Sequence, residues 1–299
     1  MLLPTYYSRI IYRNLKKTRF KIGVGISTII VVLAIIAPLI APYPDEGYGY
    51  IPADAGERKL VPPSIEHIFG TDALGRDLFS RVIIGTRTAV IQAVSVIFIS
   101  LIIGMLIGVC AAYFKGIIEI TLNYFIELFM AIPSIVIALF LRLTIGQGLH
   151  VVIASLVITW WAWYARISYV YAKSVVELEY VVLAKLSGLS ALKIIPRHVI
   201  RNIFQALTVQ AISDLGSALL EASAINFMGL GLPSGSPEWG VILYEAITER
   251  GIEAFLRSPW LVVFPGILIL VTTLGFSLVA DPLREDLDPR LRRRWKLWF

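Results

Sequence analysis

Long apolar runs that contain almost no charged residue dominate the pattern of the 299-residue chain. A helix needs about 20 apolar residues to cross the hydrocarbon core of a bilayer. Six runs reach or approach that length and predict six membrane-spanning helices, at residues 22–41, 88–114, 122–141, 149–164, 203–232 and 260–280. The fourth run is short, but its helix can extend beyond Arg166, because a long Arg side chain can reach the headgroup layer.

The composition supports a lipid environment. Hydrophobic residues make up 57% of the chain and charged residues only 16%, whereas soluble domains contain about 25% charged residues. The first run follows six Lys and Arg residues and has no convincing small-x-small cleavage site, which favours a retained first helix over a signal peptide. The single cysteine, Cys110, lies in an apolar run and excludes a disulfide framework and a Cys-rich metal site.

The 27 Lys and Arg residues are distributed unevenly between the two sides that six spans define. With the N-terminus inside, 19 of them lie in inner segments and seven in outer segments. Positive charge accumulates on the cytoplasmic side of membrane proteins, so we expect both termini in the cytoplasm and no nucleic-acid partner. Aromatic residues expected at the membrane interfaces are Trp160, Trp161, Trp163, Tyr164, Trp239 and Trp260.

The first outer loop, residues 42–87, is rich in Pro, Gly and Tyr and is predicted to be irregular. It ends in the block Gly-Thr-Asp-Ala-Leu-Gly-Arg-Asp-Leu-Phe-Ser-Arg at residues 70–81. Asp72 and Gly75 are typical of a turn, and Asp77 suits the N-cap of an amphipathic, interfacial helix over residues 78–92. These residues favour a structural role over direct contact with a ligand.

The long inner loop, residues 165–202, carries an apolar stripe. Val175, Leu178, Val182 and Leu186 have the spacing of one helix face. Gly188 should end that helix, and Ser190 can begin a second one that runs toward Ile200. Two short helices would project as a knob, and the stripe would pack either within the knob or in the groove of another protein. Periodicity leaves both alternatives open.

The fifth span contains polar residues on one helix face. Asp214, Ser217 and Glu221 lie on that face with small residues between them. Carboxylates that face lipid are costly, so the face should turn toward protein or water. It would form either a wall of a translocation pathway or a packing surface with an internally satisfied polar pair. In the third span, Glu127 precedes a kink expected at Pro133 and suggests a bundle interior.

The chain lacks the motifs of a membrane enzyme. Neither His-Glu-x-x-His nor Gly-x-Ser-x-Gly occurs, and the three histidines lie in separate loops. The phosphate-binding pattern Gly-x-x-x-x-Gly-Lys-Ser/Thr is also missing. We therefore predict no catalytic or metal site and no bound cofactor, so that any ATP used would be bound by another chain.

Four blocks of sequence resemble a known family. Residues 179–202, which run from Glu-Tyr-Val-Val-Leu-Ala-Lys-Leu-Ser-Gly to Pro-Arg-His-Val-Ile-Arg-Asn, resemble the EAA loop of ABC importer permeases. The wider pattern is similar to the second permease of the dipeptide, oligopeptide and nickel importers. The other matching blocks are residues 70–81, residues 221–233 with 236–240, and residues 286–292.

This resemblance implies an all-α fold of the type I ABC importer permease, with residues 165–202 as a cytoplasmic coupling loop that docks onto an ATPase. It implies a basic N-terminus at 1–21, a first helix at 22–41, an outer loop at 42–87, a permease domain at 88–280 and a basic tail at 281–299. Val182, Leu183 and Arg201 depart from the motif, and Pro196 is expected to relocate its bend. The implied docking residues are Leu178, Glu179, Val182, Ala184, Gly188 and Pro196.

The implied function is half of the pore of a binding-protein-dependent importer in the inner membrane. Its implied partners are a second permease, two ATP-binding subunits that use ATP and Mg, and an extracytoplasmic solute-binding protein that contacts residues 231–260. Peptide is the first expected cargo, with oligosaccharide or nickel as alternatives. A stand-alone secondary transporter that uses Asp214 and Glu221 for ion coupling is the rival interpretation.

Overall fold

The computed structural model describes residues 13–251 and 256–287, which are almost entirely helical. Within these ranges the only β-type pairing is an isolated bridge between Thr71 and Asp77. The predicted all-α architecture is confirmed. The elements are α2 (Thr18–Ile40), α3 (Pro44–Gly47), α4 (Leu78–Phe114), α5 (Gly116–Met130), α6 (Ser134–Ile145), α7 (Leu149–Val176), α8 (Glu179–Leu186), α9 (Ala191–Ile194), η1 (Ile195–Ile200), α10 (Arg201–Phe227), α11 (Trp239–Arg250) and α13 (Trp260–Leu287).

Five of these helices, α2, α4, α7, α13 and the continuous stretch from α9 through α10, are long and apolar enough to cross a membrane. A sixth crossing is obtained if α5 and α6 count as one span, but these two helices meet at 80°. The predicted span at 122–141 corresponds to this bent pair, and the kink expected at Pro133 is present, because Pro133 is the N-cap of α6. The fourth span is longer than predicted and reaches Val176.

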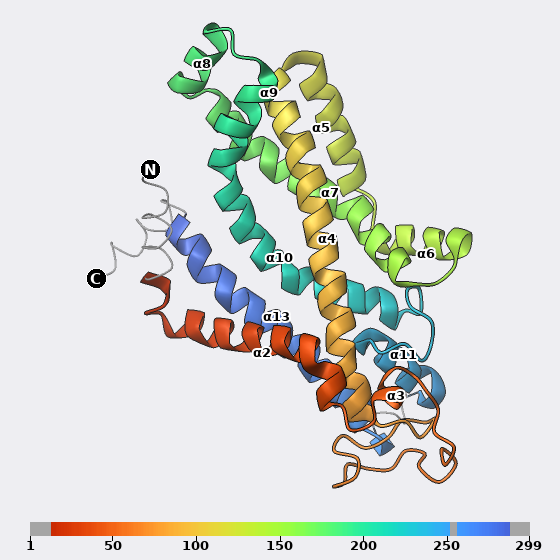
Figure 1. The fold of residues 1–299 in the computed structure, drawn as a ribbon. Coiled ribbons are helices and arrows are strands. Elements are labelled where there is room, and N and C mark those ends of the chain that lie inside the picture. The colour runs from red at the N-terminus through yellow and green to blue at the C-terminus, as the bar shows by residue number, and fades with distance from the viewer. Residues whose placement is uncertain (1–12, 252–255, 288–299) are drawn as a thin grey trace.

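The helices surround α4. Figure 1 shows α4 in the middle of the bundle, with α8 and α9 near one of its ends and α3 and α11 near the other. Two glycines allow α7 to pack closely on α4: Gly104 and Gly108 have the small-xxx-small spacing of closely packed membrane helices. A Cβ atom at either position would collide with the α7 backbone around Ala165. The sequence thus favours one tight α4–α7 pair as the core of the bundle.

Residues 177–200, defined here as the knob, follow α7 at one end of the bundle. Val181 and Ala184 of α8 are buried in a cluster with Ile194 and Val199, so part of the knob packs on itself. The predicted stripe does not lie on one helix, because α7 continues to Val176 and α8 begins only at Glu179. Gly188 ends α8 as expected and has a φ of 77°.

The second arm of the knob is an extension of α10. Ser190 occupies the N-cap position of α9 but makes no side-chain capping hydrogen bond, which contradicts the expected capping role. The predicted helix toward Ile200 is present as one turn of α-helix followed by the π-helical turn η1. Pro196 lies at the start of η1. Proline lacks an N–H donor, and a wider turn accommodates that loss.

The loop module, defined here as residues 42–77 and 233–250, lies at the end of the bundle opposite the knob. The first of these segments is irregular apart from α3, as predicted, whereas the second contains the unpredicted helix α11. Residues 78–92 do not form an interfacial helix: they are the first turns of α4, and Leu78 and Val82 are fully buried. Trp239, expected at the interface, is also buried, and its Nε1 donates to the Val82 carbonyl over 2.9 Å.

The described ends of the chain lie side by side. Asp286 near the end of α13 accepts hydrogen bonds from Arg13 and from Asn14 Nδ2, the latter over 3.0 Å. Lys17 Nζ lies 3.3 Å from Glu285 Oε2. The predicted basic tails extend beyond this junction, and their residues 1–12 and 288–299 lie outside the described ranges, as does most of the matching block 286–292.

Candidate functional site

A cavity of about 620 Å³ lies between α5, α6, α7 and α10. It brings together the three polar residues predicted from the sequence, Asp214, Ser217 and Glu221. Residues at the break between α5 and α6 line it together with residues of α7 and α10. The remaining lining residues are Phe129, Met130, Ile132, Pro133, Ser134, Thr159, Trp160 and Trp163.

Asp214 is held by donors from two helices. Its carboxylate accepts hydrogen bonds from the Tyr164 hydroxyl at 3.0 Å and from Trp163 Nε1 at 3.3 Å, both on α7. Gln210 Nε2, one turn earlier on α10, donates over 2.8 Å. Arg284 Nη2 of α13 lies 3.9 Å away. The side chain is 11% exposed, and these partners offset the cost of burying a polar group.

Glu221 lies two helical turns further along α10. One carboxylate oxygen accepts a hydrogen bond from Trp160 Nε1 over 2.8 Å, and the other accepts from the Ser134 hydroxyl. Ser134 is the first residue of α6, so Glu221 ties α10 to the broken span. Both of these donors are neutral, and Glu221 has no ion-pair partner among the described residues.

The aromatic residues of α7 have a role beyond the predicted one. Trp160, Trp163 and Tyr164 lie in the middle of the 28-residue helix and donate to the two carboxylates, which is a role that the prediction of interfacial aromatic residues did not include. Periodicity along α7 alone does not reveal partners on another helix. Glu127 also differs from expectation, because it is exposed and lies 3.6 Å from Arg166 Nη1.

The cavity is a polar surface inside a membrane bundle. Carboxylates, hydroxyls and indole N–H groups line it together with apolar side chains, which is a combination that can accommodate water and polar solutes. The described residues contain no group of three or more His, Cys, Asp or Glu arranged to hold a metal ion. The arrangement offers hydrogen-bond donors and acceptors to a polar molecule in the cavity.

The knob presents most of its predicted docking residues to the surface. Leu178 and Val182 are 44% and 41% exposed, and Glu179, Gly188 and Pro196 are exposed as well. Ala184 is buried instead, because it belongs to the internal cluster of the knob. Large apolar residues that extend the exposed face are Leu183, Leu186, Leu189 and Leu192.

Polar contacts attach the knob to the bundle. Lys185 Nζ lies 4.1 Å from the centre of the Tyr113 ring at the end of α4, which is a cation–π contact. Burial and the nearby Lys115 charge lower the pKa of Lys185. Asn202 Nδ2 donates to the Tyr180 hydroxyl over 2.8 Å. The knob is therefore connected directly to the ends of α4 and α10.

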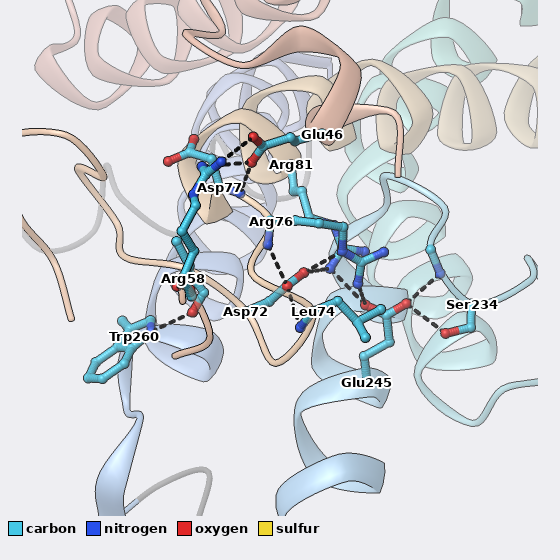
Figure 2. A network of polar contacts seen from close by, with 12 residues as sticks. Glu46, Arg58, Asp72, Leu74, Arg76, Asp77, Arg81, Ser234, Glu245 and Trp260 are labelled. Carbon is cyan, nitrogen blue, oxygen red and sulfur yellow. Dashed lines mark hydrogen bonds and ion pairs between the residues drawn. The ribbon is translucent and has the colours of Figure 1, made fainter. Parts of the chain in front are cut away.

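A buried ion network organises the loop module. Figure 2 shows Arg76 and Arg81 between two carboxylates, Asp72 and Glu245. Arg81 Nη1 lies 2.7 Å from each carboxylate, and its side chain is fully buried. Burial alone would raise the pKa of Glu245, but the charges of Arg81 and Arg76 and the hydrogen bond from Ser234 hold it below the usual value.

The predicted turn chemistry is confirmed beside this network. Asp77 is the N-cap of α4 and accepts from Ser80 N over 2.7 Å. Gly75 has a φ of 73°, and its N–H donates to the Asp72 carbonyl. His67 Nδ1 lies 2.9 Å from Asp77 Oδ1. The block at 70–81 thus has the structural role favoured by the sequence, but its partner Glu245 on α11 was missed.

Comparisons with known proteins agree with this architecture. Residues 100–293 match the family model described as binding-protein-dependent transport system inner membrane component. The dipeptide transport system permease protein DppC of Alkalihalophilus pseudofirmus is 32% identical over 283 residues, covering 94% of this chain and 89% of the relative. The probable D,D-dipeptide transport system permease protein DdpC of Escherichia coli is 36% identical, covering 78% and 76%.

Two further similarities extend the comparison. The nickel transport system permease protein NikC of Escherichia coli is 30% identical over 233 residues, covering 78% of this chain and 82% of the relative. A chain of the MetNI methionine ABC transporter, solved in inward-facing conformations, has a TM-score of 0.51 at 16% identity and covers 68% of this chain and 96% of its own length. The structural likeness shows a shared fold. Together with the family match, these findings show that the chain belongs to the binding-protein-dependent transport system inner membrane components, the permeases of ABC importers.

Proposed function

We propose that this chain is the peptide-transporting permease subunit of an ATP-driven, binding-protein-dependent importer. The observation that carries the proposal is its similarity, over 94% of its length, to a dipeptide permease. A second dipeptide permease, DppC of Bacillus subtilis, is 31% identical over 289 residues. The chain would form half of a pore and perform no chemistry itself.

The cavity between α6, α7 and α10 is the proposed segment of the solute pathway. Asp214, Ser217 and Glu221 line it, and a continuous polar surface lowers the cost of moving a polar solute through the bilayer. The second permease would complete the pathway, because this chain does not fully enclose the cavity.

The exposed face of the knob is the proposed docking surface for an ATP-binding subunit. Leucines that are 61% and 79% exposed, Leu183 and Leu186, would bury their apolar surface in a groove of that partner. The contacts of the knob with α4 and α10 would then transmit movement to the cavity. ATP and Mg would bind to two partner subunits, and the solute-binding protein would dock at the loop module.

This arrangement sets the expected orientation. The knob and the basic chain ends would face the cytoplasm, in agreement with the distribution of Lys and Arg. The loop module would face the binding protein. Residues 252–255 of the expected contact segment 231–260 lie outside the described ranges.

The assembly is tested by purifying the tagged full chain in mild detergent and identifying every co-purifying subunit. We expect a second permease and ATP-binding subunits with ATPase activity. Leu178→Glu and Leu186→Glu should each remove the ATP-binding subunits and leave the second permease. The control is Ile65→Glu, since Ile65 is fully exposed in the loop module. A chain that purifies alone and drives uptake without ATP would contradict the proposal and support a secondary transporter.

The pathway and the cargo are tested in proteoliposomes that contain the complete importer. Glu221→Gln keeps a group that can accept from Trp160 but removes the charge, whereas Glu221→Ala removes both. We expect both variants to reduce uptake while subunit assembly is retained. Uptake of labelled dipeptides, oligosaccharides and Ni²⁺ by the same vesicles identifies the cargo, and a preference for Ni²⁺ would assign the function named for NikC.

A further inference from the structure

A basic hollow of about 790 Å³ lies where the knob joins α10. Its lining residues are Leu189, Lys193, Pro196, Arg197 and Arg201, so three of five are cationic and none is acidic. The three cations recur every fourth residue along α9, η1 and the start of α10. Residues at this spacing lie on one side of a helix, which explains why they converge on one hollow.

The charge of the basic hollow is not balanced within the described part of the chain. No ion pair joins Lys193, Arg197 or Arg201 to a carboxylate there. Glu177, at the start of the knob, lies 3.6 Å from Lys115 instead. Like charges one turn apart repel each other, and an anion bound among them relieves that repulsion.

Apolar surface continues from the basic hollow along the membrane helix. Leu189 lines the hollow and is 40% exposed, and Phe204, one turn after Arg201, is 51% exposed. A free inorganic anion would use only the cations of this surface. A phospholipid would use both parts, because it joins a phosphate headgroup to an acyl chain.

We propose that the basic hollow binds the phosphate headgroup of an anionic membrane lipid, with an acyl chain lying along Phe204. Lys193, Arg197 and Arg201 bind the phosphate, and Pro196 and Leu189 form the walls. Leu189 and Pro196 also border the exposed face of the knob, but the three cations are not among the predicted docking residues, and the hollow does not line the cavity of Asp214 and Glu221. Bound lipid would brace the junction through which the knob moves α10.

The experiment measures phospholipid retained by the full chain, purified with its co-purifying subunits. The protein is exchanged into vesicles of phosphatidylcholine alone or mixed with phosphatidylglycerol, and retained lipid is quantified by native mass spectrometry. We expect selective retention of phosphatidylglycerol and a loss of affinity of about fivefold for each cation removed. Arg197→Gln/Arg201→Gln is the test variant. Lys21→Gln is the control, because Lys21 is an exposed cation near the start of α2.

The outcomes separate three occupants. Weaker retention of phosphatidylglycerol in the double variant but not in Lys21→Gln supports the proposal. Equal retention in all three proteins overturns it. Displacement of the lipid by inorganic phosphate would assign a free-anion site, and loss of ATP-binding subunits with unchanged lipid would assign a protein contact; either result also overturns it. If the double variant does not fold, the single variant Lys193→Gln gives the same comparison.

Discussion

The loop module and the knob lie at opposite ends of α4 and differ in what they bury and expose. The loop module encloses charge: Arg76, Arg81, Asp72 and Glu245 are each 5% exposed or less. The knob exposes apolar surface, with Leu186 79% exposed. Buried charges paired across the loop module hold that end together internally, whereas the exposed leucines of the knob offer apolar surface to a partner. The comparison indicates an end held together by buried ion pairs and an end whose apolar surface is available for docking.

The two ends are also stabilised by different interactions. Removing one partner of a buried ion pair strongly destabilises the folded protein, because the remaining charge stays buried and unpaired. The knob depends on a small apolar cluster around Val181 and Ile194 and on contacts such as Lys185 with Tyr113. Local changes at the knob should therefore alter docking more readily than the stability of the whole bundle.

The strongest test of the comparison removes a charge that α4 contributes to the ion network of the loop module. Arg81→Leu leaves Arg76 as the one described cation beside Glu245 and Asp72, and we expect a loss of about 3–5 kcal/mol. Thermal unfolding of the purified chain, followed by tryptophan fluorescence, measures the effect because Trp239 packs in this region. Arg87→Leu is the matched control, since Arg87 is exposed on the same helix. Equal stability of the two variants would refute the structural role of the network.

The second test concerns α4, which joins the two ends. Gly108→Leu forces a side chain into the backbone of α7 at Ala165, so we expect a loss of about 3 kcal/mol. Gly25→Leu is the control on α2, where an added Cβ atom meets nothing within 4 Å. Both variants are compared by thermal unfolding in the same detergent. If Gly108→Leu is as stable as Gly25→Leu, α4 and α7 do not pack as closely as described.

Two neighbouring residues of the knob should give contrasting results. Val181 is fully buried and Val182 is 41% exposed. We expect Val181→Ala to cost about 1–2 kcal/mol, whereas Val182→Ala should stay within about 0.5 kcal/mol of the parent. Retention of ATP-binding subunits should fall in Val182→Ala although its stability is unchanged. The reverse pattern would show that the two faces of α8 are assigned incorrectly.

Local chemistry made much of this structure predictable. Asp77 as an N-cap, Gly188 as a helix stop and Pro133 as a break are each determined by neighbouring backbone atoms. The spans were found because a bilayer requires long apolar helices. Asp214, Ser217 and Glu221 were placed on one face by helix periodicity alone, and the cavity brings all three together.

Contacts between distant segments were not predictable in the same way. The partner of Arg81 is Glu245, 164 residues later, and no periodic pattern connects them. The hydrogen bonds of Trp160 and Trp163 depend on which helix faces α7, so the sequence did not reveal them. A lone acidic residue in the apolar stretch of α11 was the available signal for Glu245, because a carboxylate in such surroundings needs a buried partner.

The smallest expected effect distinguishes two carboxylates one turn apart on α11. Glu245 has a lowered pKa, so its stabilising contribution is present at neutral pH and is lost as the pH falls through its folded value. Glu249 has a raised pKa, because of partial burial and the charges of Glu245 and Asp72. Its ionised form therefore destabilises the fold above that pKa, and the penalty disappears below about pH 4.3, the usual value of an unfolded Glu.

Glu249→Gln should consequently stabilise the loop module at neutral pH. Although neighbouring atoms partly cover its carboxylate, Glu249 as a whole is accessible to solvent, which screens the repulsion, so we expect a gain of no more than about 0.5 kcal/mol. Unfolding measured at a series of pH values should show the gain shrinking as the pH falls and vanishing in acid. Glu245→Gln should show the opposite sign at neutral pH, since it removes a partner of Arg81. If both variants changed the free energy of unfolding in the same direction, Glu245 would not be the stabilised carboxylate of α11 and Glu249 the repelled one.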